Sequence, residues 1–160
     1  MGNCHKERGS NCVADVLRLI ADRQDDVEDQ NCSVSCMRSI NELVSPAITS
    51  NVNTVPFILY GKDNTPFTGY GANVVSNGSP TFDCVSTFIF RVSEVSEDDS
   101  CAVLELLEIG TPVANTDNPC DQIGGEEVED LSRTGICITV DLDCFCGVSC
   151  LPPVALPPAP

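Results

Sequence analysis

Cysteine dominates this sequence: 11 of its 160 residues are cysteines, against a single histidine, His5. Thiols at this density are typical either of a disulfide framework in an oxidising compartment or of metal ligands in a reducing one. Because 11 is an odd number, at least one thiol lacks a partner within the chain, which favours intermolecular pairing or a reactive free cysteine. The cysteine content therefore predicts a crosslinked or metal-bound building block.

The charge balance limits the partners of the chain. Its 8 basic and 24 acidic residues give a net charge of −16, which repels phosphate backbones and anionic lipid surfaces. We therefore expect neither nucleic acid nor a membrane as a partner. The polar segment 1–7 lacks the apolar stretch of a signal peptide, and no run approaches the ~18 apolar residues of a membrane span. We expect synthesis as a cytoplasmic protein.

The first part of the chain has the periodicity of helices. Residues 11–29 place four aliphatic side chains at steps of three and four, which predicts an amphipathic helix with one apolar stripe. The stripe consists of Val13, Val16, Leu17 and Ile20. A second helix is expected over residues 33–44, capped by Ser33 and ending before Pro46.

From residue 52 onward, short apolar or alternating runs separated by turn residues are typical of antiparallel strands. Strands are expected over residues 55–60, 66–70, 85–95, 101–109 and 135–146. Turns are expected at Asn77-Gly78 and Gly124-Gly125, which tolerate positive φ. Because the helices precede the strands, the chain is predicted to be α+β, with N-terminal helices followed by a disulfide-rich antiparallel sheet or sandwich core.

Alternation along two strands predicts which residues are buried. One face of residues 135–146 carries Ile136, Ile138, Val140 and Leu142. Cys144 and Cys146 continue this parity, so we expect both thiols to face the core. In residues 101–109 apolar side chains occupy both parities, which predicts a strand covered on both faces, either in the core or at a subunit interface.

Composition divides the chain into three segments. Residues 1–10 are predicted to be a flexible N-terminal arm, and residues 11–150 a single cysteine-rich α+β assembly domain. Residues 151–160 contain five prolines and no charge, which predicts an extended, poorly paired C-terminal tail outside the core.

The residues offer little support for catalysis. His5 lies near the start of the chain, where a predicted flexible arm cannot hold a nucleophile pair in near-attack geometry. No phosphate-binding glycine motif is present. We therefore expect no enzyme activity, no catalytic residues and no cofactor.

A zinc site is the alternative use of the thiols. The possible ligand sets are Cys32 with Cys36, Cys144 with Cys146 and Cys150, and Cys4 with His5 and Cys12. None has the paired C-x-x-C spacing of a zinc ribbon or finger, so disulfides or buried thiols are preferred. A cysteine-rich metal-binding or redox protein is the competing function.

The cysteines fall into two groups by their position in the chain. Three near the exposed ends are candidates for disulfides between subunits: Cys4, Cys12 and Cys150. The others are candidates for internal disulfides or buried thiols: Cys32, Cys36, Cys84, Cys101, Cys120, Cys137, Cys144 and Cys146.

Several segments become recognisable in combination. They are residues 55–60, 65–67, 90–92, 99–104 and 137–151. The most specific is the block C-x-T-V-D-L-x-C-F-C that begins at Cys137. With these segments the chain resembles spore coat and exosporium proteins of the CotY/CotZ/ExsY type, over residues 11–151.

The resemblance implies a structural protein of the endospore surface, in the coat crust or the exosporium basal layer. It implies subunits that are made in the mother cell and assemble with themselves, in a hexamer-based lattice, and with other spore coat or exosporium proteins. Such layers are two-dimensional, cysteine-crosslinked permeability barriers. Crosslinks would form after mother-cell lysis exposes the thiols to oxidant. We expect assembly to come first, through hydrophobic contacts that include residues 101–109.

Overall fold

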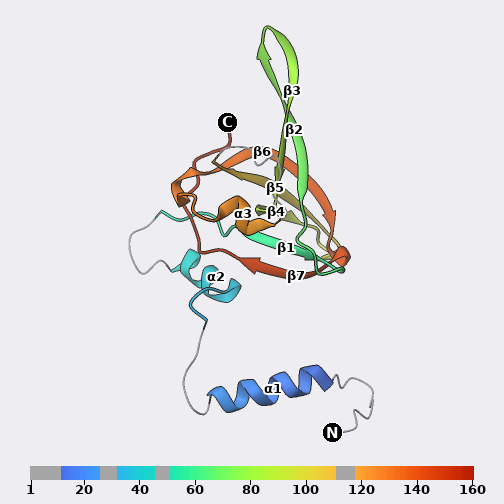
Figure 1. The fold of residues 1–160 in the computed structure, drawn as a ribbon, viewed down its shortest axis with the longest axis vertical. Helices are drawn as coiled ribbons and strands as arrows, with labels where there is room; N and C mark the ends of the chain where they lie inside the picture. Colours follow the sequence, from blue (N-terminus) through green and yellow to red (C-terminus); the bar gives the residue numbers. More distant parts are fainter. Residues whose placement is uncertain (1–11, 26–31, 46–50, 111–117) are drawn as a thin grey trace. The chain divides into compact units, whose positions relative to one another are not determined.

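The structure, a computed structural model, describes residues 12–25, 32–45, 51–110 and 118–160 (Figure 1). Its packing divides the chain into two compact units, residues 1–33 and 34–160, where the sequence suggested one domain over residues 11–150. The first unit contains helix α1 (Cys12–Asp25). This helix lies within the expected range of 11–29 and exposes Val16, Leu17 and Ile20 of the predicted stripe.

The second unit begins with helix α2 (Cys36–Val44), which lies within the expected range of 33–44. Its N-cap is Ser35 and not Ser33: the Ser35 hydroxyl accepts a hydrogen bond from the Arg38 backbone N–H at 3.1 Å. A serine two residues nearer the helix therefore satisfies one of the N–H groups left unpaired at the helix start.

The remaining elements confirm the α+β class. A five-stranded antiparallel sheet has the order β6-β5-β4-β1-β7, and β2 and β3 form a separate two-stranded sheet. The strands are β1 (Phe57–Gly61), β2 (Gly69–Asn77), β3 (Ser79–Thr87), β4 (Phe90–Val95), β5 (Cys101–Ile109), β6 (Leu131–Asp141) and β7 (Phe145–Cys150). Short helices not expected from the sequence are α3 (Pro119–Ile123), η1 (Val128–Asp130) and η2 (Leu142–Cys144).

Two of the expected strands are each divided in two. The predicted strand over 85–95 is interrupted at residues 88–89, between β3 and β4. At this point the Thr87 hydroxyl accepts a hydrogen bond from the Ile89 N–H at 3.0 Å, and the Gln122 side chain from α3 accepts one from the Phe88 N–H at 2.9 Å. These side chains satisfy backbone groups that a continuous strand would have paired with a neighbour.

The connection between β6 and β7 shows that the large sheet is curled. These strands lie at opposite edges of the sheet, and a flat sheet of five strands would separate them by about 19 Å. Only η2 joins Asp141 to Phe145, and four chain steps reach at most about 14 Å. The two edges must therefore approach each other at this corner, as the curved ribbon shows (Figure 1).

Both faces of the curled sheet carry part of the core. One cluster includes Leu107 and Ile109 of β5 together with Ile58, Phe88, Ile89, Leu131 and Leu156. The other includes Ala102, Leu104 and Leu106 of β5 together with Leu59, Phe90 and Val140. The predicted burial of both faces of residues 101–109 is thus confirmed, and its place is the core of the subunit. The expected assembly contact through these residues is wrong, because Leu106 and Leu107 have no exposed surface.

The proline-rich tail also belongs to the core, which corrects the expectation of a poorly paired arm. Val154 forms a bridge with Thr54, donating to its carbonyl at 2.8 Å. The Leu156 N–H donates to the Asn53 side chain at 3.0 Å, and the Leu156 side chain is only 5% exposed. The prolines flank Val154 and Leu156, so the extended chain still has the N–H groups and apolar side chains that it needs for docking.

A buried ion cluster joins β4, β5 and β6, which are adjacent strands of the large sheet. The Glu105 side chain is 2% exposed and lies 3.2 Å from Arg91 Nη1 and 2.9 Å from Arg133 Nη2. It also accepts a hydrogen bond from the Gly135 N–H at 3.0 Å. Burial raises the pKa of Glu105, but the hydrogen bonds from Arg133, Gly135 and Arg91 outweigh this effect and leave the pKa below its ordinary value.

The docked tail can be tested by the substitution Leu156→Ala. Removing this buried side chain should lower the free energy of unfolding by about 2–4 kcal/mol, because a cavity is left among the core residues. Val148→Ala is the control, since Val148 is 53% exposed and its truncation should cost less than about 1 kcal/mol. Urea unfolding of both variants gives the two values, and equal losses would contradict the packing of the tail.

The ion cluster can be tested by the pH dependence of Glu105→Gln. A carboxylate whose pKa is lowered by folding stabilises the protein above its unfolded pKa of about 4.3 and loses this effect as the pH falls through the folded value. The stability difference between wild type and variant should therefore be largest at neutral pH and shrink below about pH 4. Unfolding measured from pH 7 to pH 3 checks this, with exposed Glu94→Gln as the control. A difference that is independent of pH would exclude an ionised Glu105.

Candidate functional site

The cysteines are the candidate functional groups, and the structure leaves most of those it describes unpaired. Cys36 and Cys150 form a disulfide. Seven others are free: Cys32, Cys84, Cys101, Cys120, Cys137, Cys144 and Cys146. The side chains of Cys4 and Cys12, two of the thiols predicted to link subunits, lie outside the described residues.

The disulfide joins the first residue of α2 to the last residue of β7. The Cα atoms of Cys36 and Cys150 are 4.8 Å apart, across a sequence separation of 114 residues. The Ser39 hydroxyl donates to the Leu151 carbonyl at 2.8 Å beside this bond. Cys150, expected to reach a neighbouring subunit, is therefore bonded within the chain, because the edge strand β7 ends next to α2. Cys36, a candidate for either an internal disulfide or a buried thiol, forms an internal disulfide.

The expected burial of Cys144 and Cys146 is wrong, since both thiols are exposed. The alternation itself holds along β6: Ile136, Ile138 and Val140 belong to or pack against the core cluster, and Cys137 is exposed. The residues of η2 then break the period of two. In β7 it is Phe145 that packs against the core, while the Cys146 thiol donates to the Gly61 carbonyl at 2.9 Å.

The other free thiols lie on different elements. Cys84 is exposed on β3, Cys120 on α3 and Cys137 on β6, and Cys32 is exposed in the N-terminal unit. Cys101, at the start of β5, is half-buried and lies 3.7 Å from the Ser100 hydroxyl. None of these five is paired within the described part of the chain, and only Cys101 is partly buried.

The thiols do not gather into a metal site where the structure describes them. Among the described residues, no three histidine, cysteine, aspartate or glutamate side chains lie close enough to hold an ion. Two of the ligand sets considered from the sequence each lose a thiolate, because Cys36 and Cys150 are bonded to each other. The third set, Cys4 with His5 and Cys12, lies outside the described side chains.

A second surface, missed in the sequence, is the hairpin formed by β2 and β3, which projects from the large sheet (Figure 1). The expected strand over 66–70 covered only its beginning, although the turn at Asn77-Gly78 is confirmed by a φ of 102° at Gly78. The register pairs Tyr70 with Ser86, Ala72 with Cys84, Val74 with Phe82 and Ser76 with Pro80. Directly paired residues share a face, so these eight define what we call the hairpin apolar face.

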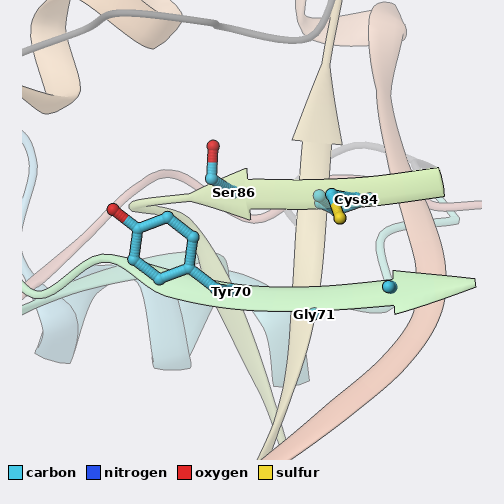
Figure 2. Close-up of a pocket in the computed structure, with 6 residues that line it drawn as sticks. Tyr70, Gly71, Cys84 and Ser86 are labelled. Carbon is cyan, nitrogen blue, oxygen red and sulfur yellow. The ribbon is translucent and has the colours of Figure 1, made fainter. Parts of the chain in front are cut away.

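The hairpin apolar face is uncovered. Tyr70, Val74 and Phe82 are 73%, 61% and 80% exposed. A hollow of about 470 Å³ lies on the hairpin and is lined by Tyr70, Gly71, Ala72, Cys84, Val85 and Ser86. Figure 2 shows Tyr70 and Ser86 at one end of this hollow and Cys84 further along β3. The alternation of apolar residues from Tyr70 to Val74 and the Asn-Gly turn were the signals for this hairpin in the sequence.

The opposite face of the hairpin is anchored to the sheet at its base. A Cβ atom added at Gly69 would lie 2.6 Å from the Phe90 ring, and one at Gly71 would lie 2.5 Å from Ile136. Only glycine permits so close an approach. Val85 packs against the same core cluster, so the anchored base directs the hairpin apolar face away from the sheet.

Comparison with known proteins identifies related sequences. The model of the family described as "Spore coat protein Z" matches residues 1–153. A curated relative, "Spore coat protein Z" of Bacillus subtilis (strain 168), is 34% identical over 148 residues, which cover 92% of this chain and 93% of the relative. No solved structure matches the chain. Within the described ranges, no helix has the length and hydrophobicity needed to cross a membrane.

The arrangement of the thiols predicts a reactivity pattern in the native protein. Iodoacetamide should modify exposed Cys84, Cys120, Cys137, Cys144 and Cys146 faster than half-buried Cys101, because reaction requires access to the sulfur. Cys36 and Cys150 should react only after reduction. Peptide mapping over a time course measures each site, with urea-unfolded, reduced protein as the control. Rapid labelling of Cys36 in the unreduced protein would contradict the disulfide.

Proposed function

Because this chain belongs to the spore coat protein Z family, we propose that it assembles with copies of itself into a two-dimensional, disulfide-crosslinked layer of the spore coat. The family supports a structural role and a location in the coat. The proposed layer is a protective permeability barrier in the crust or the exosporium, built on a hexameric lattice. Its partners are further copies of the chain and other spore surface proteins.

The observation that carries the proposal is the distribution of the free thiols. Five exposed cysteines lie on β3, α3, β6, η2 and β7. Only Cys36 and Cys150 are paired among the described side chains. A protein stabilised by its own disulfides would pair its thiols internally, whereas a subunit crosslinked to several neighbours needs thiols on several surfaces. The free thiols favour the second case.

The order of events follows from redox chemistry. Thiols stay reduced in the mother-cell cytoplasm, where we propose that the chain is made. Non-covalent contacts would then choose the geometry of the layer, and disulfides would close between neighbours when lysis admits oxidant. A disulfide between subunits makes dissociation require reduction as well as separation. Cys4 and Cys12 are, with the exposed thiols, the candidates for these bonds.

Charge opposes this assembly and must be screened. The chain has a net charge of −16, and part of it lies in the loop between β4 and β5. Hydrogen bonds from Ser100 and Ser96 lower the pKa of Asp98 in this loop to about 2, so its carboxylate stays ionised at every physiological pH. Copies of the chain therefore repel each other at low ionic strength.

A salt series tests the proposed function. Reduced protein should assemble without disulfides, and faster as salt is added, because the Debye length falls from ~30 Å at 0.01 M to ~8 Å at physiological ionic strength. Light scattering follows the rate, and electron microscopy shows whether sheets form. Subsequent oxidation should yield multimers on non-reducing gels, which a reductant disperses.

Three results would contradict the proposal. One is reduced protein that stays monomeric at high concentration under every salt condition. The second is faster assembly at low salt, which would mean that opposite charges pair across the contacts. The third is protein purified without chelator that holds stoichiometric zinc and forms no multimers, which would favour the competing metal-binding function.

A further inference from the structure

We propose that the hairpin apolar face is a two-fold docking surface for a second copy of this chain, and that the contact brings the two copies of Cys84 together. This inference rests on the proposed function, because it specifies one contact of the self-assembly described above. It is carried by three properties of the face: its exposure, its lack of charge and the positions of its side chains.

The exposure of this face is a feature of the fold. On the opposite face of the hairpin, Val85, Gly69 and Gly71 pack against one core cluster. Beyond this base, every residue from Ala72 to Cys84 is exposed. A two-stranded hairpin is marginally stable when nothing covers it. The rigid base and the uncovered apolar face together indicate a surface that is completed by another molecule.

Charge selects a second copy as that molecule. Of the residues from Gly69 to Thr87, only Asp83 is charged. Asp83 pairs with Asn73 and therefore lies on the opposite face from Tyr70, Val74 and Phe82. In a chain of net charge −16, like copies repel wherever their acidic surfaces meet. Two copies can approach through the uncharged hairpin apolar face without this repulsion. A basic partner would find no acidic side chain on this face to pair with.

The positions of the side chains fit a two-fold axis that runs across the two strands at the Ala72–Cys84 pair. Phe82 and Ser86 lie on either side of Cys84 along β3, each about 6.7 Å away along the strand. The axis therefore places Phe82 of one copy over Ser86 of the other, where the hollow lies. Cys84 lies at the level of the axis and faces its own copy, as residues on the axis of such an interface do.

The small residues of the hollow leave room for this aromatic ring. Of its lining residues, Tyr70, Ala72, Cys84 and Ser86 belong to the hairpin apolar face, and Gly71 and Val85 lie on the opposite face. Aromatic side chains that fill pockets of this kind supply most of the binding energy of small interfaces. A single hairpin face is a small interface, so we expect the reduced dimer to be weak and the crosslink to make it permanent.

The crosslink is a thiol–disulfide exchange with a low-molecular-weight disulfide as the oxidant. The Cys84 thiolate of one copy attacks this disulfide, forms a mixed disulfide and releases one small thiolate. The Cys84 thiolate of the other copy then attacks the protein sulfur, forms the bond between the copies and releases the second small thiolate. Two protein thiols are oxidised, and one small disulfide is reduced to two thiols.

The test compares full-length wild type with Phe82→Asp and its matched control Thr81→Asp. Both variants add one negative charge to exposed positions of β3, but Thr81 pairs with Val75 on the opposite face. Sedimentation equilibrium of reduced protein at physiological ionic strength measures association. We expect Phe82→Asp to weaken it by at least about tenfold and Thr81→Asp by less than about threefold. Equal thermal unfolding midpoints would show that both variants fold.

A second measurement locates the crosslink. Equal amounts of ¹⁴N- and ¹⁵N-labelled protein are mixed under reducing conditions, transferred to oxidised glutathione and digested without reduction. A Cys84–Cys84 peptide that carries one label of each kind is expected from wild type and Thr81→Asp. Phe82→Asp should give at least about tenfold less of it.

The outcomes separate this inference from the proposed function. If Phe82→Asp associates as wild type does, or if Cys84 forms no bond to its copy, the docking surface is wrong while wild-type assembly still supports a coat subunit. If reduced wild type does not associate under any salt condition, both proposals fail.

Discussion

Strand β5 is buried on both faces, and the placement of the other elements follows from this. Its apolar residues contact one cluster through Leu107 and Ile109 and the other through Leu104 and Leu106. Both faces of one strand can be buried only if other elements pack against it from two sides. The curled edges of the sheet, the anchored hairpin, α3 and the tail supply it. Glu105 in the same strand requires Arg91 and Arg133 on the adjacent strands, because an unpaired buried carboxylate is strongly destabilising.

The same constraint decides which surfaces are left for neighbours. Since β5 is used within the subunit, its hydrophobic residues cannot hold a lattice together. Exposed apolar side chains of the second unit lie on the hairpin, on α2, where Met37 and Val44 are 68% and 74% exposed, and also on β4, η1 and β7. The Cys36–Cys150 disulfide secures α2 to β7. Closing so long a loop contributes on the order of 4–5 kcal/mol in the chain-entropy model. This internal bond therefore stabilises the subunit, and the exposed thiols of the described residues are available for bonds between subunits.

Much of the fold was accessible from local patterns. The run of residues 101–109 was predicted as a strand with the bounds of β5, and the helical and strand periodicities predicted that helices precede strands. These predictions succeeded because such patterns depend only on residues that are near one another along the chain. The prediction for Cys144 and Cys146 failed because the three residues of η2 interrupt the alternation. This short helix lies between β6 and β7, at the corner where the edges of the curled sheet meet.

The sequence by itself determined the α+β class, the two-sided burial of residues 101–109 and the resemblance that led to the family, since each depends on residue order alone. Only the tertiary structure decided that Cys150 bonds to Cys36, that Leu156 packs in the core and that the hairpin apolar face is exposed. Each of these depends on which distant segments meet. Cys36 and Cys150 are 114 residues apart in the chain, and their Cα atoms are 4.8 Å apart in space. Such proximity arises from the packing of the whole sheet, and no local pattern encodes it.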